Sequence, residues 1–87
     1  MVSQKIAISN PTGLHLRPAG IFCNTAVKFD SKITFQYKNI TSNAKSLLSV
    51  LGACIKNGDE IELFCEGVDE EAALAAMIKV INDGLGE

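Results

Sequence analysis

The sequence predicts an α+β fold in which one four-stranded antiparallel sheet is covered on one face by three helices. Three observations lead to this class. The apolar periodicity changes along the 87 residues in the order strand, helix, strand, strand, helix, strand, helix. The expected strands alternate between apolar and polar residues, and each expected helix has a single apolar stripe, so only one face of the sheet should be buried. The length leaves room for one core, and we expect one domain over residues 1–87.

The first part of the chain predicts a strand, a turn and a helix. Val2, Ile6 and Ile8 alternate with polar or small residues, as in a strand with one buried face. The segment NPTG, residues 10–13, then interrupts the pattern with residues typical of turns. From Pro18 the spacing becomes helical, and one stripe contains Pro18, Ile21, Phe22, Thr25, Ala26 and Phe29.

The middle of the chain predicts a hairpin followed by a short helix. Ile33, Phe35 and Tyr37 alternate as in a strand, Lys38-Asn39 can turn, and residues 40–42 can pair back as a second strand. A short helix is expected from Leu47, with Ser46 placed as its N-cap.

The last part of the chain predicts a strand and a helix. After a turn at Asn57-Gly58, the inward side chains are those of Ile61, Leu63 and Cys65, and the outward ones are Glu60, Glu62 and Glu66. Asp69 is expected to cap the final helix, with Glu70 and Glu71 in its first turn and Gly84 at its end. Its expected buried stripe contains Leu74, Met77, Ile78 and Ile81.

The composition argues against several classes of protein. The formal net charge of −2 is unfavourable for a nucleic-acid binder, whose affinity depends on clustered Lys and Arg. Cys23, Cys54 and Cys65 are isolated and form no CxxC motif, so we expect reduced core residues rather than a zinc site or a redox pair. No apolar run has the length of a signal peptide or a membrane span. We therefore expect a soluble cytoplasmic protein that does not insert into a membrane.

The only histidine, His15, lies in the segment GLHLRPA, residues 13–19. A lone histidine is most often a partly buried, hydrogen-bonded side chain, but three features favour a functional role here. The preceding turn is polar and flexible, which places His15 near the surface. Pro18 suits the first turn of a helix, which places His15 at the helix cap or just before it. Arg17 is close enough in sequence to share a ligand with the imidazole.

These residue types in this arrangement point to transfer of a phosphoryl group. A helix N-terminus offers unpaired N–H groups and partial positive charge to an anion. A neutral imidazole nitrogen can act as the nucleophile, and the Arg17 guanidinium can neutralise phosphoryl oxygens. Hydrolytic chemistry has little support, because no partner nucleophile has a recognisable spacing, and one histidine alone cannot form a metal site.

The GLHLRPA segment resembles the active-site motif of HPr, the family of histidine-containing phosphocarriers of the bacterial sugar phosphotransferase system. A second segment, KSLLSVL at residues 45–51, adds to this resemblance, which extends over nearly the whole chain. It implies an open-faced β-sandwich, phosphorylation of His15 at Nδ1, and a phosphate contact from Arg17. It also implies a stoichiometric carrier that is not an enzyme and needs no cofactor. The phosphoryl group would pass from phosphoenolpyruvate through enzyme I to the IIA domains of sugar permeases.

Two positions depart from the usual pattern of the family. Leu16 stands where alanine is more common, and Ser49 stands where glycine is common. Neither change removes a chemical group that the transfer needs. We expect both to affect the choice of partner, through packing beside the site and through the short helix.

Leu47, Leu48 and Leu51 have helical spacing and could all belong to the core. Because Leu47 and Leu48 are adjacent, one helix face cannot bury both, and at least one should be exposed. The resemblance implies that these positions form a docking surface for enzyme I, IIA domains and regulators. Ser46 is explained by its role as an N-cap. The resemblance adds regulatory phosphorylation of Ser46 by HPr kinase/phosphorylase, with a catabolite-control regulator as a further partner.

Three alternatives to the sugar-system phosphocarrier remain. One is an HPr-like regulator that acts through Ser46 alone, which the pairing of His15 with Arg17 disfavours. Another is a carrier of the nitrogen-related branch, which shares the histidine motif and differs in partners. The last is a small domain that binds RNA on the open face of its sheet. The acidic balance and the absence of paired stacking aromatics on the strands disfavour it.

Overall fold

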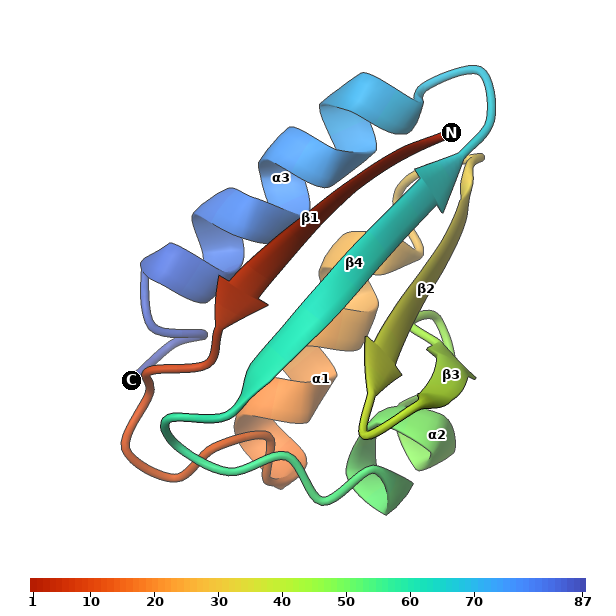
Figure 1. Ribbon diagram of the computed structural model, residues 1–87. Helices are drawn as coiled ribbons and strands as arrows, with labels where there is room; N and C mark the ends of the chain where they lie inside the picture. Colours follow the sequence, from red (N-terminus) through yellow and green to blue (C-terminus); the bar gives the residue numbers. More distant parts are fainter.

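The computed structural model describes residues 1–87 and contains four strands and three helices in the predicted order (Figure 1). Their bounds are β1 (Val2–Ala7), α1 (Leu16–Ala26), β2 (Lys32–Tyr37), β3 (Ile40–Asn43), α2 (Leu47–Gly52), β4 (Glu60–Glu66) and α3 (Glu70–Asn82). No helix combines the length and the apolar character that crossing a membrane requires. The first helix begins at Leu16, before the residue at which the helical periodicity becomes visible in the sequence.

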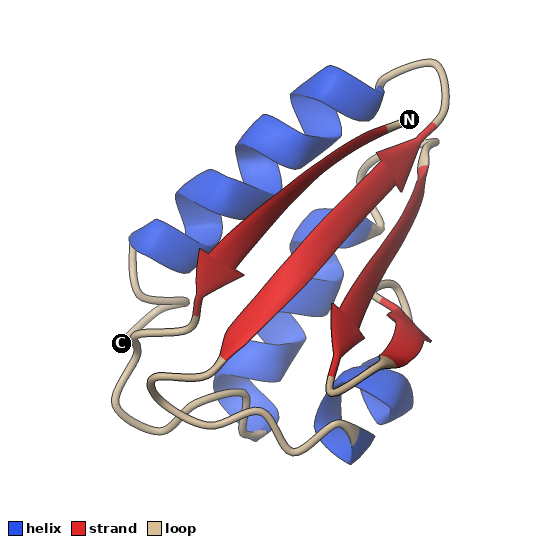
Figure 2. Cartoon of the chain, viewed as in Figure 1, coloured by secondary structure: helices blue, strands red, loops and turns tan.

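The four strands form one antiparallel sheet in the order β1-β4-β2-β3. All three helices cover the same face of this sheet, and the other face is open (Figure 2). Ile61, Leu63 and Cys65 of β4 point into the covered face and are buried, as their alternation with glutamates predicts. The predicted α+β class and its open-faced β-sandwich arrangement are therefore confirmed.

The sheet and helices enclose one hydrophobic core. Phe22 of α1 packs edge-on against Phe35 of β2, with ring centroids 5.7 Å apart, and both side chains are fully buried. The predicted stripe of α3 is confirmed at Met77 and Ile81, whereas Leu74 and Ile78 are only partly buried at its edges. The two-residue turn between β2 and β3 is also confirmed. Lys38 and Asn39 adopt positive φ angles of 51° and 66°, the geometry that suits the twist of a tight hairpin.

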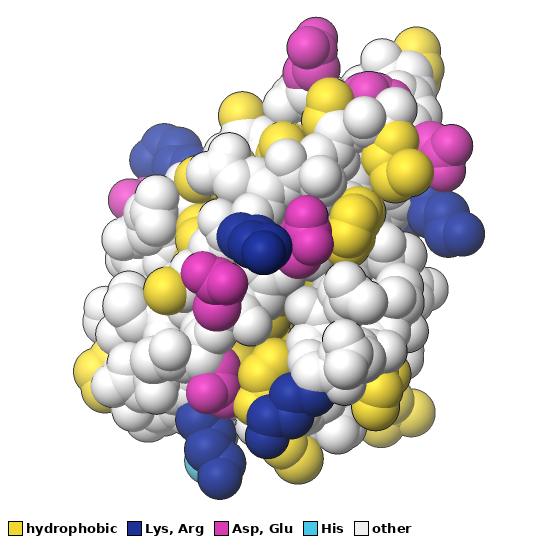
Figure 3. Space-filling view, in the orientation of Figure 1, with side chains coloured by type: hydrophobic (Ala, Val, Ile, Leu, Met, Phe, Trp, Pro, Cys, Tyr) yellow, Lys and Arg dark blue, Asp and Glu magenta, His cyan; other side chains and the backbone are white.

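The open face of the sheet carries charged side chains of both signs, as Figure 3 shows from the front. Lys5 of β1 lies opposite Glu62 of β4, and Lys32 of β2 lies opposite Glu66 of β4. Opposite charges on neighbouring strands compensate one another, so neither sign dominates this face. It lacks the clustered positive charge from which RNA-binding surfaces gain most of their affinity.

Two local predictions need correction. Asp69 is the N-cap residue of α3, as predicted, but its carboxylate makes no capping hydrogen bond and instead accepts hydrogen bonds from the Asp30 and Ser31 amides, both at 2.9 Å, and from the Ser31 hydroxyl. Cys54 is exposed, whereas Cys23 and Cys65 are buried as expected. The chain reverses just after α2 with a φ of 56° at Cys54, and this turn directs its side chain away from the core.

Candidate functional site

His15 lies exposed at the N-terminal end of α1. It is the N-cap residue, with an extended backbone (φ −76°, ψ −174°), and its carbonyl oxygen accepts a hydrogen bond from the Ala19 amide at 2.8 Å. The imidazole makes no capping hydrogen bond, so its nitrogens remain available to a ligand. The predicted position of His15, near the surface at the start of a helix, is confirmed.

The start of α1 has the electrostatic character of an anion site. The helix dipole places partial positive charge there, and no acidic residue in the first turn offsets it. The amides of Leu16 and Arg17 have no acceptor within the helix, and the buried Pro18 has no N–H to satisfy. Arg17 is exposed in the same turn and adds a full positive charge. A phosphate-sized anion is stabilised by such an arrangement.

The turn before His15 is held more tightly than its composition predicts. Asn10 is only 3% exposed, and its Nδ2 donates to the Gly13 carbonyl at 2.6 Å, while the Gly13 amide donates back to the Asn10 carbonyl at 3.1 Å. Gly13 has a φ of 66°, which a residue with a side chain rarely adopts. Leu14 is buried, and its amide donates to the Ile55 carbonyl at 3.0 Å. The turn is therefore anchored, although it is polar.

The segment that faces this turn is itself fixed by Asp59. The Asp59 carboxylate accepts hydrogen bonds from the Tyr37 hydroxyl at 2.5 Å and from the Lys56 amide at 2.9 Å. The Tyr37 hydrogen bond is the main cause of a lowered pKa for Asp59, and the same contact raises the pKa of Tyr37. Residues 55–59 thus link the histidine turn to the β2–β3 hairpin.

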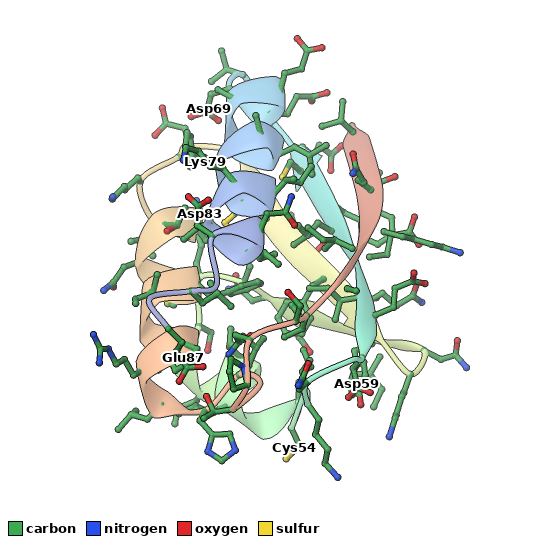
Figure 4. All side chains as sticks on the ribbon, turned by 90° about the vertical axis from the view of Figure 1, so that its left-hand side faces the viewer. Cys54, Asp59, Asp69, Lys79, Asp83 and Glu87 are labelled. Carbon is green, nitrogen blue, oxygen red and sulfur yellow. The ribbon has the colours of Figure 1, made fainter.

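Glu87 also reaches the histidine turn, and Figure 4 shows it next to the start of α1. Its carboxylate accepts hydrogen bonds from Asn10 Nδ2 at 2.9 Å and from Thr12 Oγ1 at 2.8 Å. The hydrogen bonds from Asn10 and then Thr12 lower the pKa of Glu87, and the nearby positive charge of Arg17 adds to this effect. A carboxylate from the far end of the sequence is therefore part of the site.

Helix α2 lies beside this end of the molecule and begins at the predicted N-cap. The Ser49 amide donates to Ser46 Oγ at 3.2 Å, which confirms Ser46 as the cap. Leu48 is 82% exposed, Leu47 is 37% exposed, and Leu51 is partly buried. The prediction that Leu47 and Leu48 cannot both be buried is therefore confirmed. Val50 is the fully buried residue of α2, and Leu51 also packs against the core.

A shallow groove of about 380 Å³ connects the two segments that the sequence singles out. His15 and Leu51 both contribute to its walls, so the histidine and the leucine helix face one space. The full lining consists of Leu14, His15, Leu16, Leu51, Cys54, Ile55 and Lys56. Leu16 is 69% exposed at the rim and extends the apolar surface beyond α2.

Sequence reasoning missed several members of this site. Glu87, Cys54 and Lys56 lie far from the histidine motif in the sequence, and only the folded chain brings them to it. The polar composition of residues 10–12 was a signal for a turn, but it gave no sign that Asn10 would be buried. No group of three or more His, Cys, Asp or Glu side chains is placed to hold a metal ion.

The family model described as the HPr component phosphorylation site of the phosphotransferase system matches residues 2–83. This match includes the histidine segment and both elements that flank the groove. The chain belongs to the HPr family. A curated relative named phosphocarrier protein HPr, from Treponema pallidum (strain Nichols), is 38% identical over 87 residues, which cover 100% of this chain and 99% of that protein.

Other HPr proteins agree in sequence and in fold. The phosphocarrier protein HPr of Lysinibacillus sphaericus is 32% identical over 83 residues, with 95% of this chain and 94% of that protein covered. A crystal structure of HPr from Thermoanaerobacter tengcongensis superposes with a TM-score of 0.97 at 40% identity, covering 100% of this chain and 98% of that one. The crystal structure of HPr from Bacillus anthracis superposes with a TM-score of 0.89 at 32% identity, covering 92% of this chain and 95% of that one. The chain is thus a phosphotransferase-system phosphocarrier by family.

Proposed function

We propose that this HPr carries a phosphoryl group on His15, which it accepts from phospho-enzyme I and passes to the IIA domains of sugar permeases. The observation that carries the proposal is the single histidine at the cap of α1, whose imidazole has no capping role and faces a groove shared with Leu51. The carrier acts stoichiometrically, because each molecule holds the group and gives it away without net turnover of its own. The proposal places the relay in the cytoplasm.

The transfer step uses groups at the start of α1. The lone pair of His15 Nδ1 attacks the phosphorus of the donor, and the bond between that phosphorus and the donor breaks as the new P–N bond forms. Arg17 and the unpaired amides of the first helical turn stabilise the phosphoryl oxygens during this exchange. The reverse displacement, by a nucleophile of the acceptor domain, regenerates the free imidazole.

We assign docking of these partners to an apolar surface around the groove, made by Leu47, Leu48 and Leu51. The exposure of Leu48 supports this assignment. Its side chain is 82% exposed and contributes little to the core, so it is free to contact a partner. Leu16, at the rim of the same groove, enlarges the apolar surface beside His15. Partners with a complementary apolar patch would be favoured by these leucines.

We assign regulation to Ser46, by phosphorylation from HPr kinase/phosphorylase and recognition by a catabolite-control regulator. Ser46 is half-buried as the cap of α2, next to Leu47 in the docking surface. A phosphoryl group there would add between about one and two negative charges at a helix start, which tolerates them. The same charge would interfere with a partner that expects an apolar surface.

The test is labelling by phosphoenolpyruvate in the presence of enzyme I. The wild-type protein should gain one phosphoryl group that is lost in acid and kept in alkali, as phosphohistidine requires. His15→Ala should keep its fold, because the imidazole is exposed and makes no capping bond, but it should gain no label. Ser46→Ala is the matched control and should still be labelled. Normal labelling of His15→Ala would refute the assignment.

A further inference from the structure

The segment after α3 folds back to the histidine turn along a defined path. Gly84, Leu85 and Gly86 have consecutive positive φ angles of 91°, 52° and 84°. The Leu85 side chain is fully buried, and its amide donates to the Val80 carbonyl at 3.1 Å. A Cβ atom at Gly86 would overlap with Cδ1 of Ile21, so the segment packs closely on α1. This packing delivers Glu87 to the start of that helix.

The Glu87 carboxylate binds two residues of the turn at once. Oε1 accepts from Asn10 Nδ2 at 2.9 Å, and both carboxylate oxygens lie 2.8 Å from Thr12 Oγ1. The buried Asn10 side chain also holds the Gly13 carbonyl, so the carboxylate acts on both ends of the turn. On the opposite side, Leu14 is fixed to Ile55. The turn is held between two parts of the fold.

The imidazole makes no capping hydrogen bond, so the ring is placed by the backbone on either side of His15, which is the turn before it and the first turn of α1 after it. We propose that Glu87 is a positioning residue for phosphoryl transfer: its carboxylate holds the turn of residues 10–13 and so fixes where His15 presents its ring to the donor. This inference rests on the proposed function of His15. It assigns to Glu87 no contact with the phosphoryl group and no role in docking.

The inference predicts different effects on the kcat and the KM of phosphoryl transfer from enzyme I to this protein. Glu87→Ala should lower kcat by roughly ten- to hundredfold, the size of effect expected from a small misplacement of a reacting group. KM should stay unchanged, because Leu47, Leu48 and Leu51 are untouched. Glu87→Gln keeps one acceptor oxygen, and its kcat should fall between those of wild type and Glu87→Ala. Glu71→Ala removes an equal charge from an exposed position on α3 and should transfer like wild type.

Amide hydrogen exchange supplies a readout that does not depend on transfer. In Glu87→Ala the Gly13 amide, which donates within the turn, should exchange several-fold faster, whereas amides of β4 should keep their protection. Thr12→Val removes the hydroxyl donor and should reduce kcat in the same way. The double variant should be no slower than Glu87→Ala alone, since that variant already lacks the contact with Thr12 that Thr12→Val removes.

Each outcome decides the matter. Wild type that gains no phosphohistidine refutes the proposed function and the inference with it. Wild type that is labelled, with Glu87→Ala transferring at the same kcat, leaves the function intact and overturns the inference alone. A lower kcat with unchanged Gly13 exchange would mean that the charge of Glu87 acts directly, and a change in KM alone would mean docking. Either result overturns the positioning role, as does additive loss in the Thr12→Val double variant.

Discussion

Substitution of Gly13 by alanine tests how the histidine turn is held. A Cβ atom at this position would lie 2.6 Å from the Ile55 carbonyl oxygen and 2.8 Å from the Lys56 Cα, and both are backbone atoms that cannot rotate away. The φ of 66° adds a conformational penalty of about 1–2 kcal/mol for a residue with a Cβ. Movement that relieves the overlap would break the hydrogen bond from Leu14 to Ile55, worth about 1 kcal/mol.

These terms predict that Gly13→Ala lowers the free energy of unfolding by about 2–3 kcal/mol. For a domain of this size the melting temperature should fall by roughly 10–20 °C. Gly20→Ala is the matched control, because Gly20 lies inside α1 and a Cβ there meets no atom within 4 Å. It should raise the free energy of unfolding by about 0.5–1 kcal/mol, through the helix propensity of alanine.

Calorimetry or thermal circular dichroism of the three proteins measures both effects. Phosphoryl acceptance at a temperature where all three are folded should be reduced in Gly13→Ala and unchanged in Gly20→Ala. If Gly13→Ala melts at the same temperature as wild type, the turn can move away from residues 55–56 without loss of stability, and the anchoring described above is wrong.

Other predictions concern single side chains. Arg17→Ala should slow phosphoryl transfer without lowering the melting temperature, and Arg17→Lys should lie between it and wild type, because lysine lacks the planar guanidinium; equal initial rates would contradict a role in transfer. Ser46→Ala should lose about 1 kcal/mol of stability with its cap and transfer normally. Ser46→Asp should melt no lower than wild type but accept phosphate more slowly at limiting enzyme I, and a wild-type rate would leave Ser46 as a cap only. Hydrogen bonds from Ser31 and from the Asp30 amide lower the pKa of Asp69 in the folded protein. They therefore stabilise the fold at pH values above the pKa that Asp69 has in the unfolded chain. This stabilisation is lost as the pH falls through the pKa of Asp69 in the folded protein. Urea unfolding of Asp69→Asn should therefore show reduced stability at pH 7 and a smaller difference from wild type below about pH 4, and a constant difference would contradict this linkage.

Most of the fold follows from local patterns in the sequence. The alternation of apolar and other residues in β4 predicts which of its side chains are buried. The adjacency of Leu47 and Leu48 requires one of them to be exposed. Ser46 is predictable as a cap because its hydroxyl acts on a residue three positions away. The position of His15 follows from Pro18 and the turn before it. All these features depend on neighbours within one turn or one strand.

The features that could not be predicted depend on distant parts of the chain. Asp69 has the sequence context of a cap, yet the amides of residues 30–31 compete for its carboxylate and bind it. Cys54 is apolar enough for a core, but the left-handed turn after α2 exposes it. Glu87 is separated from Asn10 by 77 positions, and no periodicity marks their contact.

The anchors of the histidine turn have a consequence for the order of folding. The Ile8 amide donates to the Asp59 carbonyl at 2.8 Å, and Leu14 and Asn10 are held by Ile55 and Glu87. Each of these contacts joins residues more than 40 positions apart, and a chain without other long-range contacts would have to close such a loop at an entropic cost of about 3–4 kcal/mol, which the two-residue β2–β3 hairpin does not face. The hairpin and helices can therefore form while residues 10–15 are still unconstrained. Phosphoryl acceptance would then report that the last long-range contacts have formed, which makes it a functional marker of complete refolding.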